Sequence, residues 1–567
     1  MYDSHHHPLI VQSDLAVLLD ESKPNAQAAR EKLVQFAETV KRAGSVHTFK
    51  ITALTLWNAA AAGMAAEDVI QCLKQFGRYE LPFQAEASIK RLMGRYGRLS
   101  LISEAGKLYL QGEPEVLGQL AGHASVGSFV KHRENPDRWE LEAGCRGSFK
   151  QELTRLGYPV IDRAGFHLGE ELQVQLRGQT LGNRHFSLRD YQREAVDRFY
   201  QEEAVHGGCG VVVLPCGAGK TVVGIAALAR LGRATLILTS NNTSVRQWRD
   251  ELLDKTTLTS EEIGQYGGAL KQVRPVTIAT YQILTHRKSK DSAFSHMKLF
   301  SERDWGLIIY DEVHLLPAPV FRMTAELQAT RRLGLTATLV REDGCAEDVY
   351  SLIGPKQYDM QWKTAEAGSY IASVSCTEIR VPLTKEKEQQ YHEATARSKL
   401  RLAAENPGKI PVVRELLQTH ADKPTLIIGQ YLNQLHELAH ELQAPLLTGE
   451  IPQHERQVLY ERFKAGEIKV LIVSKVANFA VDLPDASVAI QLSGSFGSRQ
   501  EEAQRIGRLL RPKQGDNSAW FYSLVTERTK ETEFAVKRQV FMLEQGYPYD
   551  RRSSGIDPSS GWEAVNR

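Results

Sequence analysis

The stretch Leu214-Pro-Cys-Gly-Ala-Gly-Lys220-Thr221 decides the fold of the central part of the chain. It follows the apolar run Val211–Val213 and precedes Val222–Leu231, so it predicts a turn that joins a buried strand to a helix. Gly217 and Gly219 would let backbone N–H groups close around phosphate oxygens, and the helix dipole favours an anion at the same place. The stretch therefore predicts a phosphate-binding loop.

This loop departs from the generic pattern at one position, because Leu214 stands where the first glycine is usual. We expect Lys220 to neutralise the β- and γ-phosphate oxygens and the Thr221 hydroxyl to bind Mg²⁺. The other residues expected at the nucleotide phosphates are Pro215, Cys216, Gly217, Ala218 and Gly219.

A pair of acidic residues forms the second signal, since Asp311 and Glu312 directly follow the apolar run Leu307–Tyr310. Carboxylates at the end of a buried strand cost free energy unless they have a task. We expect Asp311 to hold Mg²⁺ through water and Glu312 to orient and polarise the attacking water. The alternative is that Asp311 only caps a helix. The phosphate loop upstream favours the catalytic interpretation.

Short apolar segments alternate with helical ones from residue 188 to about residue 525. Continuous Val, Ile and Leu runs between helices are typical of buried parallel sheets. Nine such runs are too many for one ordinary domain, so we expect two α/β domains in tandem. The expected strands are Gly210–Leu214, Thr235–Leu238, Val276–Thr280, Trp305–Tyr310, Leu333–Ala337, Thr425–Ile428, Val470–Val473, Val488–Leu492 and Trp520–Leu524.

The composition fits a soluble protein of several domains. The 567 residues are 42% hydrophobic and 24% charged, and 70 basic against 68 acidic residues leave a net charge of +2. This balance excludes a protein that works only through a basic surface. Six cysteines without Cys-x-x-Cys spacing indicate neither a zinc ribbon nor a disulfide framework. With no apolar run long enough for a bilayer and no signal peptide, we expect a cytoplasmic protein.

The flanking segments are expected to be accessory. Residues 1–111 contain a helix-like stretch over Asn25–Ala43, then three more such stretches and a hairpin, which leaves a winged helix and a helical adaptor both open. Residues 112–182 suggest a small α+β domain, with Leu172–Leu176 among its strands. The tail 546–567 is rich in Gly, Ser, Pro and Arg and is expected to be disordered.

Asp311-Glu-Val-His314 after such a loop resembles the signature of superfamily 2 helicases, and more narrowly the XPB family in its bacterial and archaeal form. The resemblance covers nearly the whole chain and is weakest over 112–182 and the tail. The stretches that carry it are Ser244-Val-Arg-Gln-Trp248, Thr280-Tyr-Gln282, Asp311–Ala318, Leu333–Asp343, Ser474–Pro484 and Gly497–Arg511.

The resemblance implies two RecA-like parallel-sheet lobes, with the ATP-binding lobe over 183–370 and the second lobe over 371–545. The second lobe would contain a helical thumb insertion at about 380–410. An α-rich N-terminal domain over 1–111 would take the partner-binding position. The small α+β domain over 112–182 would take the damage-recognition position.

Further nucleotide contacts are implied by the resemblance. Tyr191-Gln192 resembles the adenine-reading motif. Arg189 and Gln192 are the residues expected at the base, because an amide can make two hydrogen bonds to adenine's N6 and N7 edge. A plain helix-surface residue is the alternative for Gln192. Asp482 is also expected to contact the nucleotide.

Arg508 and Arg511 lie three residues apart, on one face of an expected helix. A planar, permanently charged guanidinium suits the γ-phosphate, and Gln504 would help place both arginines. Their implied role is catalytic, whereas a solvated basic face is the alternative.

DNA contacts are implied at several places. Arg341-Glu342-Asp343 would contact DNA near the duplex fork, with a solvated turn as the alternative. Lys385–Ala404 would grip the phosphate backbone, although its own acidic residues also allow a self-paired, solvated helix. The residues expected at DNA are Arg246, Thr280, Arg341, Glu342, Asp343, Arg397, Lys399 and Lys475.

These features predict a Mg²⁺- and ATP-dependent DNA helicase or translocase, with 3′-to-5′ polarity, a DNA repair role and a possible nuclease partner implied by the resemblance alone. We expect it in the cytoplasm, associated with the nucleoid. Two alternatives remain: a nucleotide-gated DNA-binding scaffold without turnover, and a superfamily 2 motor that tracks RNA.

Overall fold

The computed structural model describes residues 6–43, 45–142, 144–201, 207–268, 270–286, 295–327, 330–337, 346–474, 486–494, 502, 505–507, 509 and 517–555. The chain forms two compact units. The first comprises residues 1–214 and 219–359, and the second comprises residues 215–218 and 360–567.

The N-terminal part of the first unit contains more sheet than expected. Its antiparallel sheet has the strand order β1-β2-β4-β3, and its core includes Phe36 and Phe49. The expected helix over Asn25–Ala43 is wrong in its second half, because α1 ends at Leu33 and the chain turns into β3, which pairs with β4. The elements are β1 (Leu9–Val11), β2 (Ala16–Asp20), α1 (Ala26–Leu33), β3 (Glu38–Ala43) and β4 (Val46–Lys50).

Three helices and a hairpin follow, as the sequence predicts. The hairpin does not stand alone, because its strands also pair with β8 and β9 in a five-stranded sheet ordered β7-β8-β6-β5-β9. The expected boundary between residues 111 and 112 therefore falls inside β6 and separates β5 and β6 from the other three strands of their own sheet. The elements are α2 (Ala53–Ala61), α3 (Ala66–Phe76), α4 (Phe83–Met93), β5 (Leu99–Glu104), β6 (Lys107–Gly112), α5 (Pro114–Ala121), α6 (Ala124–Gly127), β7 (Val130–Asn135), β8 (Arg138–Leu141), α7 (Arg146–Arg155) and β9 (Ile161–Asp162).

An extended segment then runs along the next sheet. The expected strand Leu172–Leu176 is wrong, because this stretch makes only isolated bridges, Glu171 to Arg233 and Leu176 to Thr256. Its backbone nevertheless bonds to its neighbours, as in Leu172 N–H to Gly232 O at 2.9 Å. The segment thus bonds to the residues before β11 and to the residue after α10 without forming a strand of the sheet.

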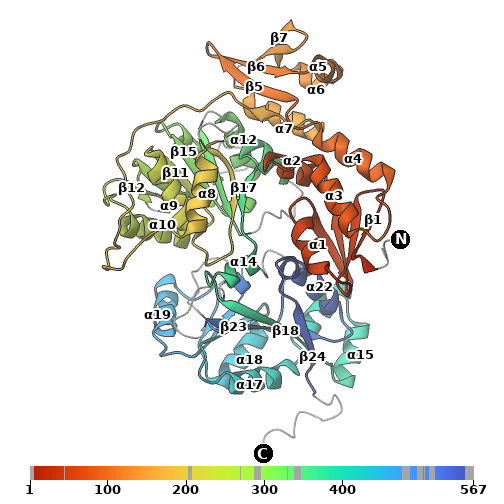
Figure 1. The fold of residues 1–567 in the computed structure, drawn as a ribbon. Helices are drawn as coiled ribbons and strands as arrows, with labels where there is room; N and C mark the ends of the chain where they lie inside the picture. Colours follow the sequence, from red (N-terminus) through yellow and green to blue (C-terminus); the bar gives the residue numbers. More distant parts are fainter. Residues whose placement is uncertain are drawn as a thin grey trace, which may run out of the picture. The chain divides into compact units, whose positions relative to one another are not determined.

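The first unit's large sheet has the order β13-β12-β14-β11-β15-β16-β10-β17 and is parallel except for β13. All five strands expected here are present. Helices α8, α9 and α10 pack side by side against it (Figure 1). The elements are α8 (Asp190–Tyr200), β10 (Cys209–Val213), α9 (Lys220–Leu231), β11 (Thr235–Thr239), α10 (Asn242–Lys255), β12 (Ile263–Gly267), β13 (Leu270–Lys271), β14 (Val276–Thr280), α11 (Tyr281–Leu284), η2 (Met297–Phe300), β15 (Leu307–Asp311), η3 (Val313–Leu315), α12 (Ala318–Glu326), β16 (Arg331–Thr336), α13 (Ala346–Leu352) and β17 (Lys356–Asp359).

The second unit is built on a fully parallel sheet, ordered β20-β21-β19-β22-β23-β18-β24. The four strands expected in it are present, which gives the α/β lobes of the predicted fold class. The elements are α14 (Trp362–Ala367), β18 (Ser373–Val381), α15 (Lys385–Glu393), α16 (Ala396–Ala404), α17 (Lys409–Thr419), β19 (Thr425–Gly429), α18 (Leu432–Leu442), β20 (Leu446–Leu447), α19 (Gln453–Lys464), β21 (Val470–Ser474), β22 (Val488–Gln491), β23 (Ser518–Thr526), α22 (Lys530–Glu544) and β24 (Tyr549–Ser553).

The C-terminal tail is not wholly disordered, which corrects the sequence-based expectation. Residues Tyr549–Ser553 form β24, parallel to β18 at the sheet edge. Two tyrosines anchor it, because Tyr547 is buried and the Tyr549 hydroxyl donates to Glu502 Oε1 at 2.7 Å. The rest of the tail, from residue 556, lies outside the described residues.

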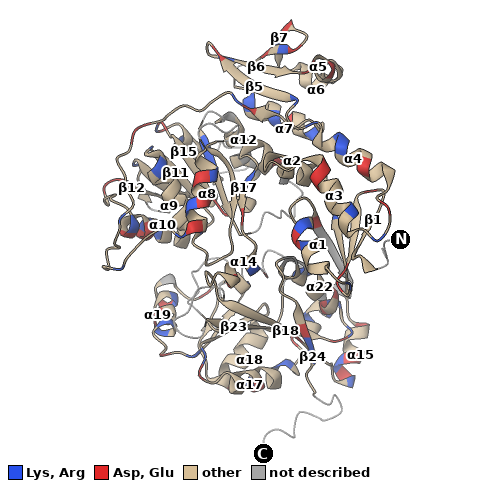
Figure 2. Ribbon diagram, in the orientation of Figure 1, with Lys and Arg blue, Asp and Glu red and all other residues tan. Residues whose placement is uncertain are grey.

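The expected thumb stretch is two helices rather than one. Thr395 caps α16 and separates it from α15. The Tyr391 hydroxyl accepts the Lys530 backbone N–H at 2.9 Å, and Thr526 Oγ1 donates to Ala403 O at 2.7 Å. Both helices thus bond to the region around β23 and α22. Figure 2 shows charges of both signs on α15, in line with the self-paired alternative.

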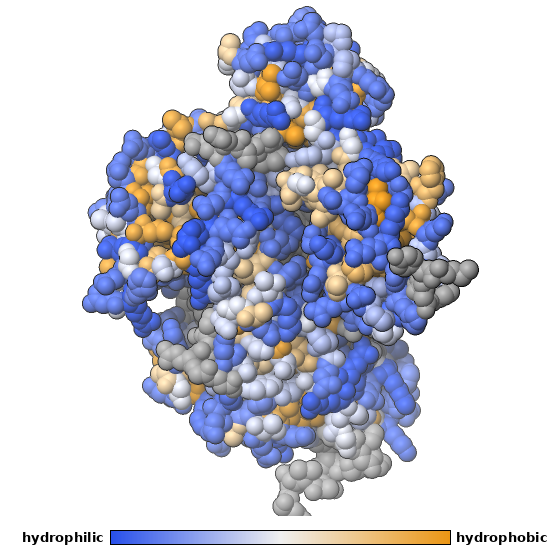
Figure 3. Space-filling model, in the orientation of Figure 1, coloured by the Kyte–Doolittle hydropathy of each residue, from blue (hydrophilic) through white to orange (hydrophobic). Residues whose placement is uncertain are grey.

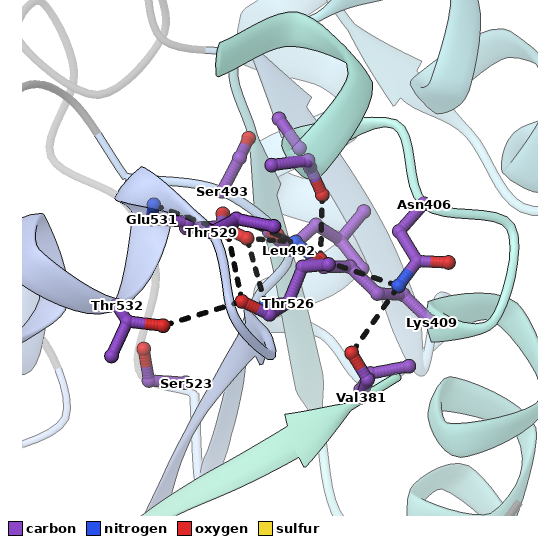
Figure 4. A network of polar contacts seen from close by, with 12 residues as sticks. Val381, Asn406, Lys409, Leu492, Ser493, Ser523, Thr526, Thr529, Glu531 and Thr532 are labelled. Carbon is purple, nitrogen blue, oxygen red and sulfur yellow. Dashed lines mark hydrogen bonds and ion pairs between the residues drawn. The ribbon is translucent and has the colours of Figure 1, made fainter. Parts of the chain in front are cut away.

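A buried polar network ties this region together (Figure 4). Lys409, at the start of α17, is fully buried; its Nζ donates to Leu492 O at 2.7 Å and pairs with Glu531 Oε2 at 2.9 Å. Glu531 also accepts the Thr526 backbone N–H at 2.9 Å. Because each buried charge has partners, the network fixes the end of β22 against α22.

The drawn face is mostly hydrophilic, with apolar residues scattered over it (Figure 3). No helix in the described part of the chain is long and apolar enough to span a bilayer.

Candidate active site

The phosphate loop and the acidic pair lie at the same edge of the first unit's sheet. The loop follows β10 and the pair ends β15, with only β16 between these two parallel strands. The Leu214 N–H donates to Thr336 O at 3.0 Å, which joins the start of the loop to the end of β16. Ligands of open parallel sheets bind at this carboxyl edge.

The local backbone fits a phosphate loop. Gly217 and Gly219 have φ of +82° and +81°, in the left-handed region that glycine adopts without strain. Gly219 is also the N-cap residue of α9, which begins at Lys220. The first N–H groups of this 12-residue helix therefore follow directly on the loop.

Gln192 lies against this loop. A Cβ added to Gly219 would be 2.6 Å from Gln192 Nε2, so the amide packs directly against this glycine. Gln192 Oε1 accepts the Arg189 N–H at 3.0 Å, and Arg189 Nη1 donates to the Tyr191 hydroxyl at 3.2 Å. The structure thus brings the residues expected at adenine next to those expected at the phosphates.

Lys220 reaches from the loop to the acidic pair, with Nζ 3.6 Å from Glu312 Oε1. Glu312 itself has φ +51° and ψ +53°, a left-handed backbone. This conformation costs a residue with a side chain about 1–2 kcal/mol. Backbone strain of this kind is concentrated at functional sites.

The pKa values of the two carboxyl groups are shifted in opposite directions. Burial and the neighbouring Glu312 charge raise the pKa of Asp311 to about 6. Burial also acts to raise the pKa of Glu312, but the Lys220 ammonium and His314 outweigh it, so this pKa lies below its usual value. Glu312 is therefore the carboxylate of the pair that stays ionised most readily, as a group that polarises water must.

His314 joins the acidic pair to the end of β16. Its Nδ1 lies 2.7 Å from Thr336 Oγ1 and 3.5 Å from Glu312 Oε2, and its side chain is buried. Thr336 belongs to the run Thr336-Ala-Thr338, of which Thr338 lies outside the described residues. The histidine thus forms a polar link between Glu312 and that run.

Two aromatic side chains hold Asp311, and no role for either was predicted from the sequence. Trp248 Nε1 donates to Asp311 Oδ2 at 2.9 Å, and the Tyr281 hydroxyl donates to Asp311 O at 2.9 Å. A buried tryptophan or tyrosine needs a partner for its N–H or O–H. That need was readable from the sequence, but the partner was not.

The donors at this edge fit a magnesium ion. Mg²⁺ prefers oxygen ligands and keeps several waters, so one carboxylate and one hydroxyl suffice. Asp311, whose pKa is raised to about 6 beside a second carboxylate, gains from a nearby cation. Thr221 follows Lys220 in the first turn of α9. These two residues would hold the ion, and no cluster of other metal-binding side chains is found among the described residues.

The residues expected at DNA differ in how far their exposure allows a contact. Arg246 is exposed on α10, as a DNA contact requires. Thr280 is buried and its hydroxyl accepts the Ile283 N–H at 3.2 Å, so it caps α11 rather than facing solvent. Lys399 lies over the Tyr391 ring at 5.6 Å. Outside the described residues lie Arg341, Glu342, Asp343, Lys475, Asp482, Gln504, Arg508, Arg511 and the side chain of Arg397.

A phosphate loop and an Asp-Glu pair at the carboxyl edge of a parallel sheet define a phosphate-loop protein of the helicase class. Three family models match the chain. ERCC3/RAD25/XPB C-terminal helicase matches residues 365–557, Type III restriction enzyme, res subunit matches 185–341, and Helicase conserved C-terminal domain matches 9–135.

The relatives narrow the class to one family. The chain is 51% identical over 96% of both chains to DNA 3′-5′ helicase XPB of Kineococcus radiotolerans. It is 48% identical to DNA 3′-5′ helicase XPB of Mycobacterium tuberculosis, over 96% of this chain and 97% of the relative. It is 40% identical to the putative DNA 3′-5′ helicase Rad25 of Halobacterium salinarum, over 94% and 84%. The chain therefore belongs to the XPB family of helicases.

Proposed function

We propose that this protein is a DNA helicase or translocase that hydrolyses ATP with Mg²⁺, moves 3′ to 5′ and acts in DNA repair. One observation carries the proposal: Lys220 of the phosphate loop lies 3.6 Å from Glu312 of the acidic pair. This arrangement places a phosphate-binding cation beside a carboxylate that can polarise water. Membership of the XPB family supports DNA as the substrate and 3′ to 5′ as the direction of movement.

The proposed chemistry follows from the site's charges. Lys220 neutralises the γ-phosphate, and ATP would then take over the cation that now pairs with Glu312. Glu312 accepts a hydrogen bond from the attacking water, and so polarises and orients it. Bound Mg²⁺, held by Asp311 and Thr221, would supply charge neutralisation at the β- and γ-phosphates.

Residues elsewhere in the chain complete the proposal. Gln192 and Arg189 read adenine, and Asp482 adds a nucleotide contact. Gln504, Arg508 and Arg511 stabilise the charge of the transferring phosphoryl group, where an arginine is worth roughly 10³–10⁵ in rate. The exposed Arg246 contributes to DNA binding.

The accessory parts have proposed roles as well. We assign partner binding to residues 1–111, with a nuclease as the proposed partner, and recognition of damaged DNA to residues 112–182. A protein that moves on DNA would be found in the cytoplasm with the nucleoid.

ATPase measurements across single-stranded, duplex and forked DNA and RNA test the proposal. We expect DNA to stimulate phosphate release, and Lys220→Ala to abolish it while far-ultraviolet circular dichroism stays unchanged. Lys298→Ala is the matched control, because Lys298 is exposed and pairs only with Glu302 among the described contacts. Turnover in Lys220→Ala near the wild-type rate would refute the site. Stimulation by RNA alone would favour the RNA motor, and ATP binding without turnover would favour the scaffold.

A further inference from the structure

Two segments of the first unit, far apart in the sequence, meet at one residue of the acidic pair. The first is Ser244–Trp248 on α10, and the second is Thr280–Gln282 at the start of α11. Ser244–Trp248 follows the buried strand β11, and Thr280–Gln282 begins at the last residue of the buried strand β14. These parallel strands are neighbours, with Thr239 opposite Thr280. Each segment sends one aromatic side chain to Asp311.

Trp248 makes the contact to the Asp311 carboxylate. It is buried, with 1% of its surface exposed, and its Nε1–H donates to Oδ2 at 2.9 Å. The indole fills the space left by a glycine of α9: a Cβ on Gly224 would lie 2.5 Å from Trp248 Cη2 and 3.0 Å from Leu335 Cδ1. The ring therefore has no room to move independently of α9 and β16.

Tyr281 makes the contact to the Asp311 backbone. It is also buried, and its hydroxyl donates to the Asp311 carbonyl at 2.9 Å. The Thr280 cap fixes the turn that aims the ring, because the Thr280 hydroxyl accepts the Ile283 N–H. Carboxylate and carbonyl of the same residue are thus held from two different helices.

The same two segments present polar residues to solvent. Arg246 is exposed two positions before Trp248, and Gln282 is exposed immediately after Tyr281. A cation on this surface is suited to a phosphate backbone. Each segment therefore pairs a solvent-facing polar residue with an aromatic residue bound to Asp311.

We propose that Trp248 and Tyr281 are positioning residues that couple DNA occupancy of α10 and α11 to the geometry of Asp311, and so to magnesium and ATP. The inference rests on the proposed function. A small displacement of either helix on binding DNA would lengthen a 2.9 Å hydrogen bond, and such bonds weaken steeply with geometry. By reciprocity, nucleotide at Asp311 must alter the affinity for DNA by the same factor.

Loss of Trp248 and loss of Tyr281 should have different effects on magnesium affinity. Trp248 bonds to the carboxylate that would hold Mg²⁺, and loss of such a partner typically costs about tenfold or more in metal affinity. The Tyr281 hydroxyl bonds to the Asp311 carbonyl and not to its carboxylate, so its loss should alter the coupling with little change in magnesium affinity.

The variants are Trp248→Phe and Tyr281→Phe, which keep a buried ring and remove one donor each. The first unit supplies matched controls. Trp305 is buried and donates to Leu299 O at 2.9 Å, and Tyr310 is buried with its hydroxyl 2.9 Å from Thr324 Oγ1. Trp305→Phe and Tyr310→Phe therefore impose the same chemical change without touching the Asp311 contacts.

The main readout is the affinity of the full chain for forked DNA, with and without a non-hydrolysable ATP analogue and Mg²⁺. We expect the ratio of the two affinities to fall at least threefold towards one in both variants and to stay at the wild-type value in both controls. A second readout is the Mg²⁺ concentration that half-saturates binding of a fluorescent ATP analogue. It should rise about tenfold in Trp248→Phe only.

The outcomes separate the inference from the function. A wild-type ratio in both variants would overturn the inference alone. Equal losses of both DNA affinities, with the ratio kept, would also overturn it, because that result indicates only a structural role. A wild-type protein in which DNA affects neither ATP binding nor hydrolysis would overturn the proposed function itself. If Trp248→Phe fails to fold, Tyr281→Phe, which loses one oxygen, decides the question.

Discussion

Asp162 is a carboxylate that lies among three buried or nearly buried cations of the first unit. It accepts Arg146 Nη2 at 2.8 Å and Lys150 Nζ at 2.8 Å, and the Arg332 guanidinium is buried nearby. Asp162→Asn keeps the shape of the side chain and removes its negative charge, so the buried cations lose the charge that balances theirs. Removing one partner of a buried pair costs about 3–5 kcal/mol.

This cost should be visible in the thermal unfolding of the full chain. At about 2 °C per kcal/mol for a unit of this size, we expect the first transition to fall by about 6–10 °C. Asp190→Asn is the matched control, because the Arg193–Asp190 pair is exposed and should contribute nothing measurable. Replacing both partners, in Asp162→Asn with Lys150→Met, should recover part of the loss. A fall of less than about 2 °C in Asp162→Asn would refute the reasoning.

The pH dependence gives a second readout of the same cluster. Burial and the neighbouring cations lower the pKa of Lys150 to about 8, against an ordinary value of 10.5. Between these two values the unfolded chain binds more protons than the folded one, so this group makes the free energy of unfolding rise with pH. Lys150→Met should remove that rise. A rise of equal size in the variant would show that other groups cause it.

Three further predictions concern turnover. Glu312→Gln should bind ATP at near wild-type affinity yet release phosphate very slowly, measured by equilibrium binding and single-turnover hydrolysis; normal turnover would place the base elsewhere. Arg508→Ala and Arg511→Ala should lower kcat by roughly 10³-fold or more with little change in ATP affinity, whereas a rise in KM alone would indicate ground-state binding. Arg341→Ala with Asp343→Ala should keep DNA-stimulated ATPase and lose fork unwinding on the same preparation; loss of both would contradict a fork contact.

The sequence predicts the central sheets well, because their strands are apolar on both faces and carry their own signal. Val276–Thr280 and Thr425–Gly429 are buried throughout. Elements whose pairing partner is distant are predicted poorly: Glu38–Ala43 was expected to be helical, and Tyr549–Ser553 to be disordered. Both are polar strands at a sheet edge, held by a neighbour that local periodicity does not contain.

The candidate site divides in the same way. Lys220, Asp311 and Glu312 are recognisable because each sits in a local strand-to-turn pattern. The partners of Asp311 are not, since Trp248 and Tyr281 lie 63 and 30 positions away in the sequence. The sequence indicated only that a buried tryptophan N–H and a buried tyrosine O–H need hydrogen-bond acceptors, and not that Asp311 supplies them. The domain boundary near residue 111 fails for the same reason, because β9 joins its sheet from 50 residues downstream.

The left-handed backbone of Glu312 bears on how this chain can be engineered. Glycine at position 312 would relax the backbone and lose the carboxylate, so selection for heat resistance alone would drift towards an inert protein. A library screened only for folding would therefore favour the inactive glycine variant over the active Glu312 protein. Directed evolution of this chain has to score hydrolysis in every round, since the residue that stability would discard first is the one that the chemistry uses.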